Sequence, residues 1–167
     1  MNRAHRRLAL RLIAPGAAVI TVGVIARADA PPGQYDPFNR ADTVITDAKT
    51  GLNWQRTVMT STNFVGAVIA CSGLSLGNFP TNWRLPSYKE LLTLVDESPH
   101  AEYPTGAPVW IAIDPYAFPE TPVDNPYWTS SVVPSGGSVF TVEFKAGNGG
   151  TSPVSAMLYV RCVNDGM

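Results

Sequence analysis

Two cysteines carry the most reactive side chains of this 167-residue chain, Cys71 and Cys162. A cysteine nucleophile needs a partner base nearby, and beyond residue 30 the sequence offers one histidine, His100, in the proline-bounded segment ESPHAEYP. The alternative is a disulfide, which would close a loop of about ninety residues and contribute on the order of 4 kcal/mol in the chain-entropy model. An exported chain with two cysteines most simply pairs them, so we favour the disulfide.

The N-terminus predicts export. Four arginines precede a mostly apolar run, Leu12–Ala26, and Ala28 and Ala30 supply small residues at the spacing that signal peptidase reads. We therefore expect a signal peptide over residues 1–30 and a secreted, periplasmic or cell-surface location. An uncut anchoring helix is the alternative, but Pro15 would break a regular span. After residue 30 no stretch is apolar enough to cross a membrane.

The chain after residue 30 is acidic. Removal of residues 1–30 takes away five of the twelve basic residues and one of the thirteen acidic ones, leaving seven against twelve and a net charge of −5. The remaining lysines and arginines are scattered singly, whereas binding of nucleic acid or polysulfated glycans requires clusters of them. We therefore expect no nucleic-acid partner. The hydrophobic content of 45% is ample for the core of one domain.

Residues 98–125 carry candidate ligand-binding groups. Seven prolines between residues 97 and 126 and the absence of a clear period predict a long ordered loop here, the kind of segment in which binding often occurs. Carboxylate and amide oxygens suit calcium, but their spacing matches no defined metal loop, so we expect no cofactor and keep calcium as an alternative. The candidate oxygen donors are Asp114, Glu120, Asp124 and Asn125, and the candidate aromatic groups for stacking on a sugar are Trp110, Tyr116 and Tyr127.

The segment WRLPSYKELL invites two interpretations. In one, Arg84 engages an acidic ligand beside the face of Trp83. In the other, which we favour, Trp83 is a core residue and Arg84 is held by a carboxylate or by backbone carbonyls. Pro86 keeps the preceding residue extended, and Ser87 with Glu90 three residues later predicts a capping box at a helix start. The segment then supports the fold and is not itself the site.

These groups must be positioned by two helices and several short strands. From Ser61 a stripe of Phe64, Val68, Cys71 and Leu74 predicts an amphipathic helix, and Leu91, Leu94 and Val95 predict the buried face of the second. Strands are predicted in the segments 43–47, 51–57, 127–131, 139–144 and 157–163, with a turn at GNGG (147–150). Leu158, Val160 and Cys162 share a face of the last strand, so both cysteines point inward. Residues 31–41 are expected to form a flexible leader and residues 164–167 a tail.

The motifs TDAKTGLNWQR, WRLPSYKELLTLVD, FPETP, YWTSS and YVRCV, with Cys71 on a helix, occur in one order over residues 42–163. Together they resemble the domain family named for the C-terminal domain of Lcl, a bacterial collagen-like adhesin. The resemblance implies an α+β, C-type-lectin-like fold, with two helices packed on a small twisted antiparallel sheet and long irregular loops. Its motif residues, expected to be structural, are Trp54, Trp83, Arg84, Pro86, Ser87, Glu90, Trp128 and Arg161.

The family resemblance also implies a function. It suggests an exported bacterial lectin-like binding module that recognises a surface glycan or protein ligand through residues 98–125 and the adjoining strands. The adhesin's preference for sulfated glycans is not carried over, because this chain is acidic and has no Gly-X-Y repeat. An enzyme on the related formylglycine-generating-enzyme-like fold is the alternative, but that chemistry requires active-site cysteines. The sequence leaves the oligomeric state open.

Overall fold

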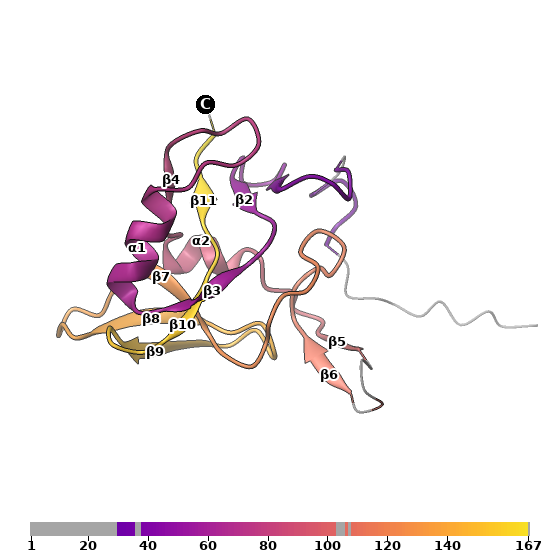
Figure 1. The fold of residues 1–167 in the computed structure, drawn as a ribbon. Helices are drawn as coiled ribbons and strands as arrows, with labels where there is room; N and C mark the ends of the chain where they lie inside the picture. Colours follow the sequence, from indigo (N-terminus) through magenta and orange to yellow (C-terminus); the bar gives the residue numbers. More distant parts are fainter. Residues whose placement is uncertain (1–29, 36–37, 103–105, 107, 167) are drawn as a thin grey trace, which may run out of the picture.

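The computed structural model describes residues 30–35, 38–102, 106 and 108–166, and within them the chain forms two helices and eleven strands (Figure 1). The fold is α+β, as predicted. The helices are α1 (Phe64–Ser72) and α2 (Tyr88–Leu92). Apart from Ala30, the predicted signal peptide lies outside the described residues. In the described part of the chain, no helix has the length and apolar character needed to cross a bilayer.

The strands form two sheets and a separate hairpin. The four-stranded sheet has the order β1 (Val44–Thr46), β2 (Asn53–Gln55), β11 (Val163–Asn164) and β4 (Trp83–Arg84). The five-stranded sheet has the order β3 (Met59–Thr62), β10 (Leu158–Val160), β7 (Tyr127–Val132), β8 (Ser138–Val142) and β9 (Gly149–Pro153). The hairpin pairs β5 (His100–Glu102) with β6 (Val109–Ile111) and extends away from both sheets (Figure 1).

The prediction of one antiparallel sheet was wrong in two respects. The β10 strand pairs with β7 in parallel and with β3 in antiparallel fashion, so the larger sheet is mixed. In addition, the C-terminal segment leaves one sheet and enters the other: β10 ends at Val160, and β11 begins at Val163 between β2 and β4. Arg161 and Cys162 occupy the crossing point, which places both side chains at the centre of the domain.

Two hydrophobic clusters fill the interior, and alternate residues of the segment 158–162 pack in one cluster or against the other. Leu158, Val160 and Cys162 join the cluster beneath α1, whereas Tyr159 packs against the other cluster. The predicted disulfide is confirmed: Cys71 on α1 is bonded to Cys162, with their Cα atoms 5.5 Å apart. The bridge fixes α1 to the crossing point between the sheets.

The buried stripe predicted for the first helix was wrong at one residue, because Phe64, Cys71 and Leu74 pack on the cluster beneath α1 and Val68 does not. Asn63 caps it by accepting a hydrogen bond from Gly66 N at 2.9 Å. Ala67 and Cys71 are fully buried, whereas Val68 is 43% exposed. Both residues fit a helical period, and the prediction chose the larger aliphatic side chain. The helix packs closely against β4 and β7, where a small side chain suits the contact.

The second helix begins as predicted but is shorter. Ser87 Oγ accepts from Glu90 N at 3.2 Å, and the Glu90 carboxylate accepts from Ser87 N at 2.6 Å, which completes the capping box. The helix ends at Leu92, with Thr93 as its C-cap. Leu94 is nevertheless buried, so it packs from the turn after the helix and not from the helix itself.

The segment predicted as a flexible leader packs on the domain. Tyr35 is buried, and its ring meets that of Phe118 edge-on with centroids 5.2 Å apart. Gln34 O accepts a hydrogen bond from Ala48 N at 2.8 Å. At the other end, Asn164 is buried in β11, so the predicted tail belongs partly to the sheet. The buried ring of Tyr35 anchors the first segment, and strand pairing with β2 and β4 holds Asn164.

The chain also contains strands that the sequence did not predict. Hairpin β5–β6 lies inside the segment predicted as an irregular loop, and β3 and β9 are rich in Thr, Ser and Gly. Part of the expected GNGG turn therefore belongs to β9, because the chain already turns at residues 144–146. A Cβ atom on Gly149 would overlap the hydroxyl of Tyr88. Glycine is thus needed for the close approach of α2 to this strand.

Candidate functional site

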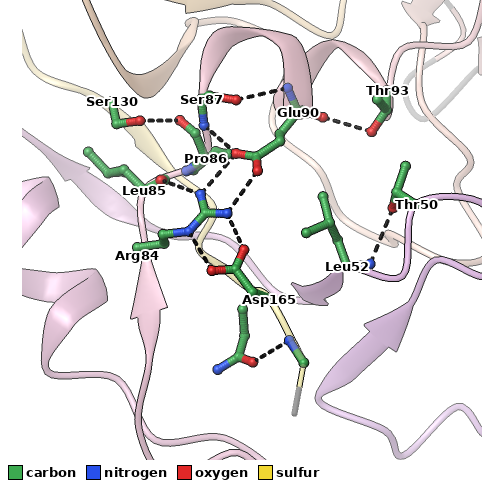
Figure 2. A network of polar contacts seen from close by, with 12 residues as sticks. Thr50, Leu52, Arg84, Leu85, Pro86, Ser87, Glu90, Thr93, Ser130 and Asp165 are labelled. Carbon is green, nitrogen blue, oxygen red and sulfur yellow. Dashed lines mark hydrogen bonds and ion pairs between the residues drawn. The ribbon is translucent and has the colours of Figure 1, made fainter.

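The arginine of the WRLP segment, Arg84, binds the carboxylates of Glu90 and Asp165 (Figure 2). Arg84 Nη1 and Nη2 donate to the two Glu90 carboxylate oxygens at 2.9 and 2.8 Å. Arg84 Nε donates to Asp165 Oδ2 at 3.1 Å, and Arg84 Nη2 donates to the other oxygen of Asp165. The hydrogen bonds from Arg84 lower the pKa of Glu90 from 4.5 to about 2. With two carboxylates bound, this guanidinium joins β4, α2 and the C-terminus.

The neighbouring residues of this segment are also structural. Trp83 is buried, and its Nε1 donates to Phe79 O at 2.9 Å. The carbonyl of Pro86 accepts from Ser130 N at 2.7 Å, which ties the start of α2 to β7. The geometry therefore agrees with the scaffolding interpretation of this segment and leaves no open face on Trp83 for a ligand.

Two buried arginines connect the candidate binding loop to the rest of the domain, Arg56 through the loop's backbone and Arg161 through its side chains. Arg56 Nη2 donates to Tyr116 O at 3.1 Å, and its Nε donates to Ala117 O at 3.2 Å. Arg161 Nη1 donates to Gln55 O and Arg56 O at 2.9 and 2.8 Å.

The Arg161 side chain continues from there to the loop. Its Nη2 donates to Thr121 Oγ1 at 2.9 Å, and its guanidinium lies over the Phe118 ring, 4.6 Å from the centroid. Complete burial lowers the pKa of Arg161 to about 10, so it remains a cation at neutral pH. Arg161 and Arg56 fix residues 116–121 relative to β2 and the C-terminal segment.

The candidate aromatic residues divide between core and surface. Tyr127 is fully buried and donates its hydroxyl to Pro122 O at 2.9 Å, so its assignment to a ligand site was wrong. Trp128 is also fully buried, with Nε1 donating to Thr62 O at 2.8 Å. Trp110 on β6 and Tyr116 are each 50% exposed. Burial, which the sequence pattern did not resolve in this region, separates the two groups.

The four candidate calcium ligands do not converge. Asp114 Oδ1 accepts from Tyr116 N and Ala117 N at 2.8 and 2.9 Å, which closes a local turn. Asp124 Oδ1 accepts from the Tyr159 hydroxyl at 3.1 Å. Glu120 is exposed, as is Asn125, and Glu120 has a φ of 54°. Within the described ranges no three Asp, Glu, His or Cys side chains are grouped in a way that could hold a metal ion.

A groove of about 270 Å³ lies beside Glu120 and Tyr159. Its apolar floor consists of Val58, Met59, Pro119, Pro122 and Tyr159, and its polar lining consists of Thr57, Thr60 and Glu120. The Tyr159 ring packs on that of Tyr127 at 5.4 Å between centroids, while its hydroxyl is held by Asp124. The positive φ of Glu120 is uncommon for a non-glycine residue, and strain of this kind is often found at functional sites.

Sequence reasoning did not place Tyr159 in the site. The signal was present, because the inward assignment of Leu158 and Val160 implies that Tyr159 faces the opposite side. Thr60 gave no such signal, since β3 was not predicted, and Thr57 stood only as the last residue of the predicted strand 51–57. Pro119, Glu120 and Pro122 of the groove lie inside the segment 98–125. The predicted ligand-binding residues all lie outside the groove lining: Trp110, Asp114, Tyr116, Asp124, Asn125 and Tyr127.

A family model described as the Lcl C-terminal domain matches residues 43–164. The match covers well over half of the chain, and its bounds follow the ordered elements from the start of β1 to the end of β11. No curated protein and no solved structure matches the chain.

Proposed function

Because the chain belongs to the Lcl C-terminal domain family, we propose that it is an exported, C-type-lectin-like binding module whose ligand is a glycan. The observation that carries this proposal is the groove beside Tyr159, on the surface of the segment that Arg56 and Arg161 hold. Binding, and not catalysis, is the proposed activity. No metal or other cofactor is part of the proposal.

The chemistry of the groove suits a sugar ring. Pyranose rings present an apolar C–H face, which packs on tyrosine and proline surfaces, and Tyr159 with Pro119 and Pro122 offers such a floor. Hydroxyl groups at the ring edge need hydrogen-bond donors and acceptors, which Thr57 and Thr60 supply as hydroxyls. A site with a few polar groups around an apolar floor is typical of small-molecule recognition.

The charge of the groove favours a neutral sugar or an amino sugar. Glu120 lines the groove, and Asp124 lies beside it on the hydroxyl of Tyr159. Neither Lys nor Arg is among the residues that line it. A sulfated or carboxylated sugar would meet these like charges without a compensating cation.

Export is the second part of the proposal. It rests on the arginine-rich start and apolar run of residues 1–26 and on the small residues that follow. The bond between Cys71 and Cys162 supports it, because disulfides persist mainly in oxidising compartments. Intact mass of the protein recovered from an exporting bacterial host would test this, and retention of residues 1–28 would contradict it.

A glycan array, run with and without calcium, tests the binding proposal. We expect binding to neutral or amino sugars in both conditions. Tyr159→Ala should weaken binding by about fivefold, equivalent to about 1 kcal/mol of stacking. The control is Trp110→Ala, which removes an exposed aromatic residue outside the groove and should leave binding unchanged.

Three results would contradict the proposal: no glycan binding in either condition, turnover of a glycan by the protein, or loss of binding with Trp110→Ala alone. Because Tyr159 also contacts Tyr127, thermal unfolding of Tyr159→Ala must show that the variant is folded. Tyr159→Phe, which keeps the ring and removes only the bond to Asp124, gives a second measure of the same site.

A further inference from the structure

A second hollow, of about 370 Å³, lies where the described chain begins. Its titratable lining residues are Tyr35, Asp96, Glu97 and Asp114, and Ala30 and Pro31 form part of the wall. Among the described residues, neither Lys nor Arg contributes to the lining. Pro31 and Asp114 also line a smaller hollow next to it, so the chain passes directly over this carboxylate.

Two carboxylates of the hollow, those of Asp114 and Asp96, are oriented by backbone N–H donors, and one oxygen of Asp96 lacks a donor. Asp114 Oδ2 accepts from Ala30 N at 3.0 Å, while its Oδ1 closes the local turn. Asp96 Oδ1 accepts from Ser98 N at 2.8 Å. Asp96 Oδ2 is buried and has no hydrogen-bond partner among the described residues. A buried carboxylate oxygen without a donor is costly, so the site favours an additional N–H group, and a cation most of all.

The beginning of the chain is held in place at this hollow. Pro31 O accepts from Gln34 N at 3.0 Å, which forms a turn, and Gln34 O accepts from Ala48 N at 2.8 Å. Tyr35 is anchored in the core. The position of Pro31 is therefore set by the folded domain and does not depend on the residues before Ala30.

We propose that this hollow is the binding site for the chain's own α-ammonium group, created when the signal peptide is removed after Ala30. A signal peptidase would hydrolyse the Ala30–Pro31 bond, with water giving its hydroxyl to the Ala30 carboxyl and its proton to the Pro31 nitrogen. Before cleavage the Pro31 nitrogen has no hydrogen to donate. Once protonated, it is a cation with two N–H donors beside Asp114.

Cleavage also frees the hydrogen-bond acceptor that this cation would use, Asp114 Oδ2. The amide of Ala30 departs with the signal peptide, and Asp114 Oδ2 then loses the donor described above. The ammonium of Pro31, one residue further along, replaces an uncharged donor with a charged one, and such hydrogen bonds are about twice as strong. Asp96 adds a second carboxylate to the lining of the same hollow. Removal of the signal would thus lock the mature N-terminus onto the domain.

The test measures how well the fold protects the new amine. The full chain is produced in an exporting bacterial host, its N-terminus is determined by intact mass, and the processed protein is acylated with a limiting N-hydroxysuccinimide ester at pH 7. Acylation is quantified on the tryptic peptide of residues 31–40, with Lys145 as the internal reference amine. We expect a terminus at Pro31, acylated about tenfold more slowly than in Asp114→Asn, because a rise of one pKa unit leaves tenfold less free amine.

Asp114→Asn is chosen because its amide oxygen can still accept from Tyr116 N and Ala117 N. Asp96→Asn should give a partial loss of protection by the same reasoning. The control, Asp124→Asn, removes an acidic residue outside this hollow and should leave acylation as in the wild type. Equal acylation of the wild type and Asp114→Asn, or a terminus other than Pro31, would overturn the proposal. It rests on export and not on glycan binding, which the array measures separately.

Discussion

Replacing Glu90 by Gln separates the charge of the Glu90 side chain from its capping role. Gln keeps an oxygen that can accept from Ser87 N, as in the usual capping box. It lacks the negative charge that pairs with Arg84. The hydrogen bonds from Arg84 to that charged carboxylate lower the pKa of Glu90 from 4.5 to about 2. The substitution therefore removes the ion pair in Figure 2 and leaves the start of α2 in place.

The pKa of Glu90 sets the size of the effect. A pKa lowered from 4.5 to about 2 corresponds to an upper limit of roughly 3 kcal/mol for the ionised carboxylate. The side chain of Arg84 is 37% exposed, and solvent screening weakens such a pair. We therefore expect Glu90→Gln to lower the free energy of unfolding by about 1 to 2 kcal/mol at pH 7.

The pH dependence follows from the direction of the shift. Since the folded state holds the pKa of Glu90 below its unfolded value, the stabilisation is fully present above pH 4.5 and disappears as the pH falls towards 2. Urea unfolding of the wild type and Glu90→Gln at pH 7, 4 and 2.5 should give curves that converge with acid. Ser87→Ala is the control, because loss of its cap should cost about 1 kcal/mol at each pH. A Glu90→Gln deficit that is absent at pH 7, or equally large at pH 2.5, would refute this account.

Three further predictions test the packing of the domain. Replacing both Cys71 and Cys162 by Ala should lower the free energy of unfolding by about 4 kcal/mol in urea, since the bond closes a loop with a sequence separation of 91; unchanged stability would contradict the bridge. Arg161→Met should cost about 2 to 4 kcal/mol, because the carbonyls of Gln55 and Arg56 lose their donor, and a thermal melt like that of the wild type would argue against this. Ala67→Leu should destabilise by about 1 to 3 kcal/mol through overpacking, whereas Val68→Leu should stay within about 0.5 kcal/mol. The opposite order in urea would reject the observed buried face of α1.

Features encoded by a few neighbouring residues could be predicted. The capping box of Ser87 and Glu90 depends on local hydrogen bonds alone, so its spacing identified the start of α2. The disulfide was predicted from the number of cysteines and from the inward faces of the elements that carry them. The α+β class and the family followed from motifs whose order along the chain is specific.

Features that depend on distant contacts could not be predicted. The choice between Ala67 and Val68 on α1 is made by its close packing on β4 and β7, which no helical period reveals. The leader was judged by its prolines and glycines, although one buried side chain, Tyr35, is enough to anchor it. In the candidate site, Tyr127 was expected on the surface but is buried, and Tyr159, for which no role was predicted, lines the groove, because the end of the chain passes beside β7.

The way in which Arg56 and Arg161 are bonded has a consequence for specificity. Arg56 holds the candidate loop through backbone carbonyls of residues 116 and 117, and Arg161 reaches it through Thr121. Backbone contacts do not depend on which side chain a residue carries. The surface side chains of the loop, Glu120 among them, can therefore change without releasing it. For the proposed glycan site, the two arginines would set where the groove lies, and the side chains on both of its edges, Thr57 and Thr60 as well as Glu120, would set what it binds.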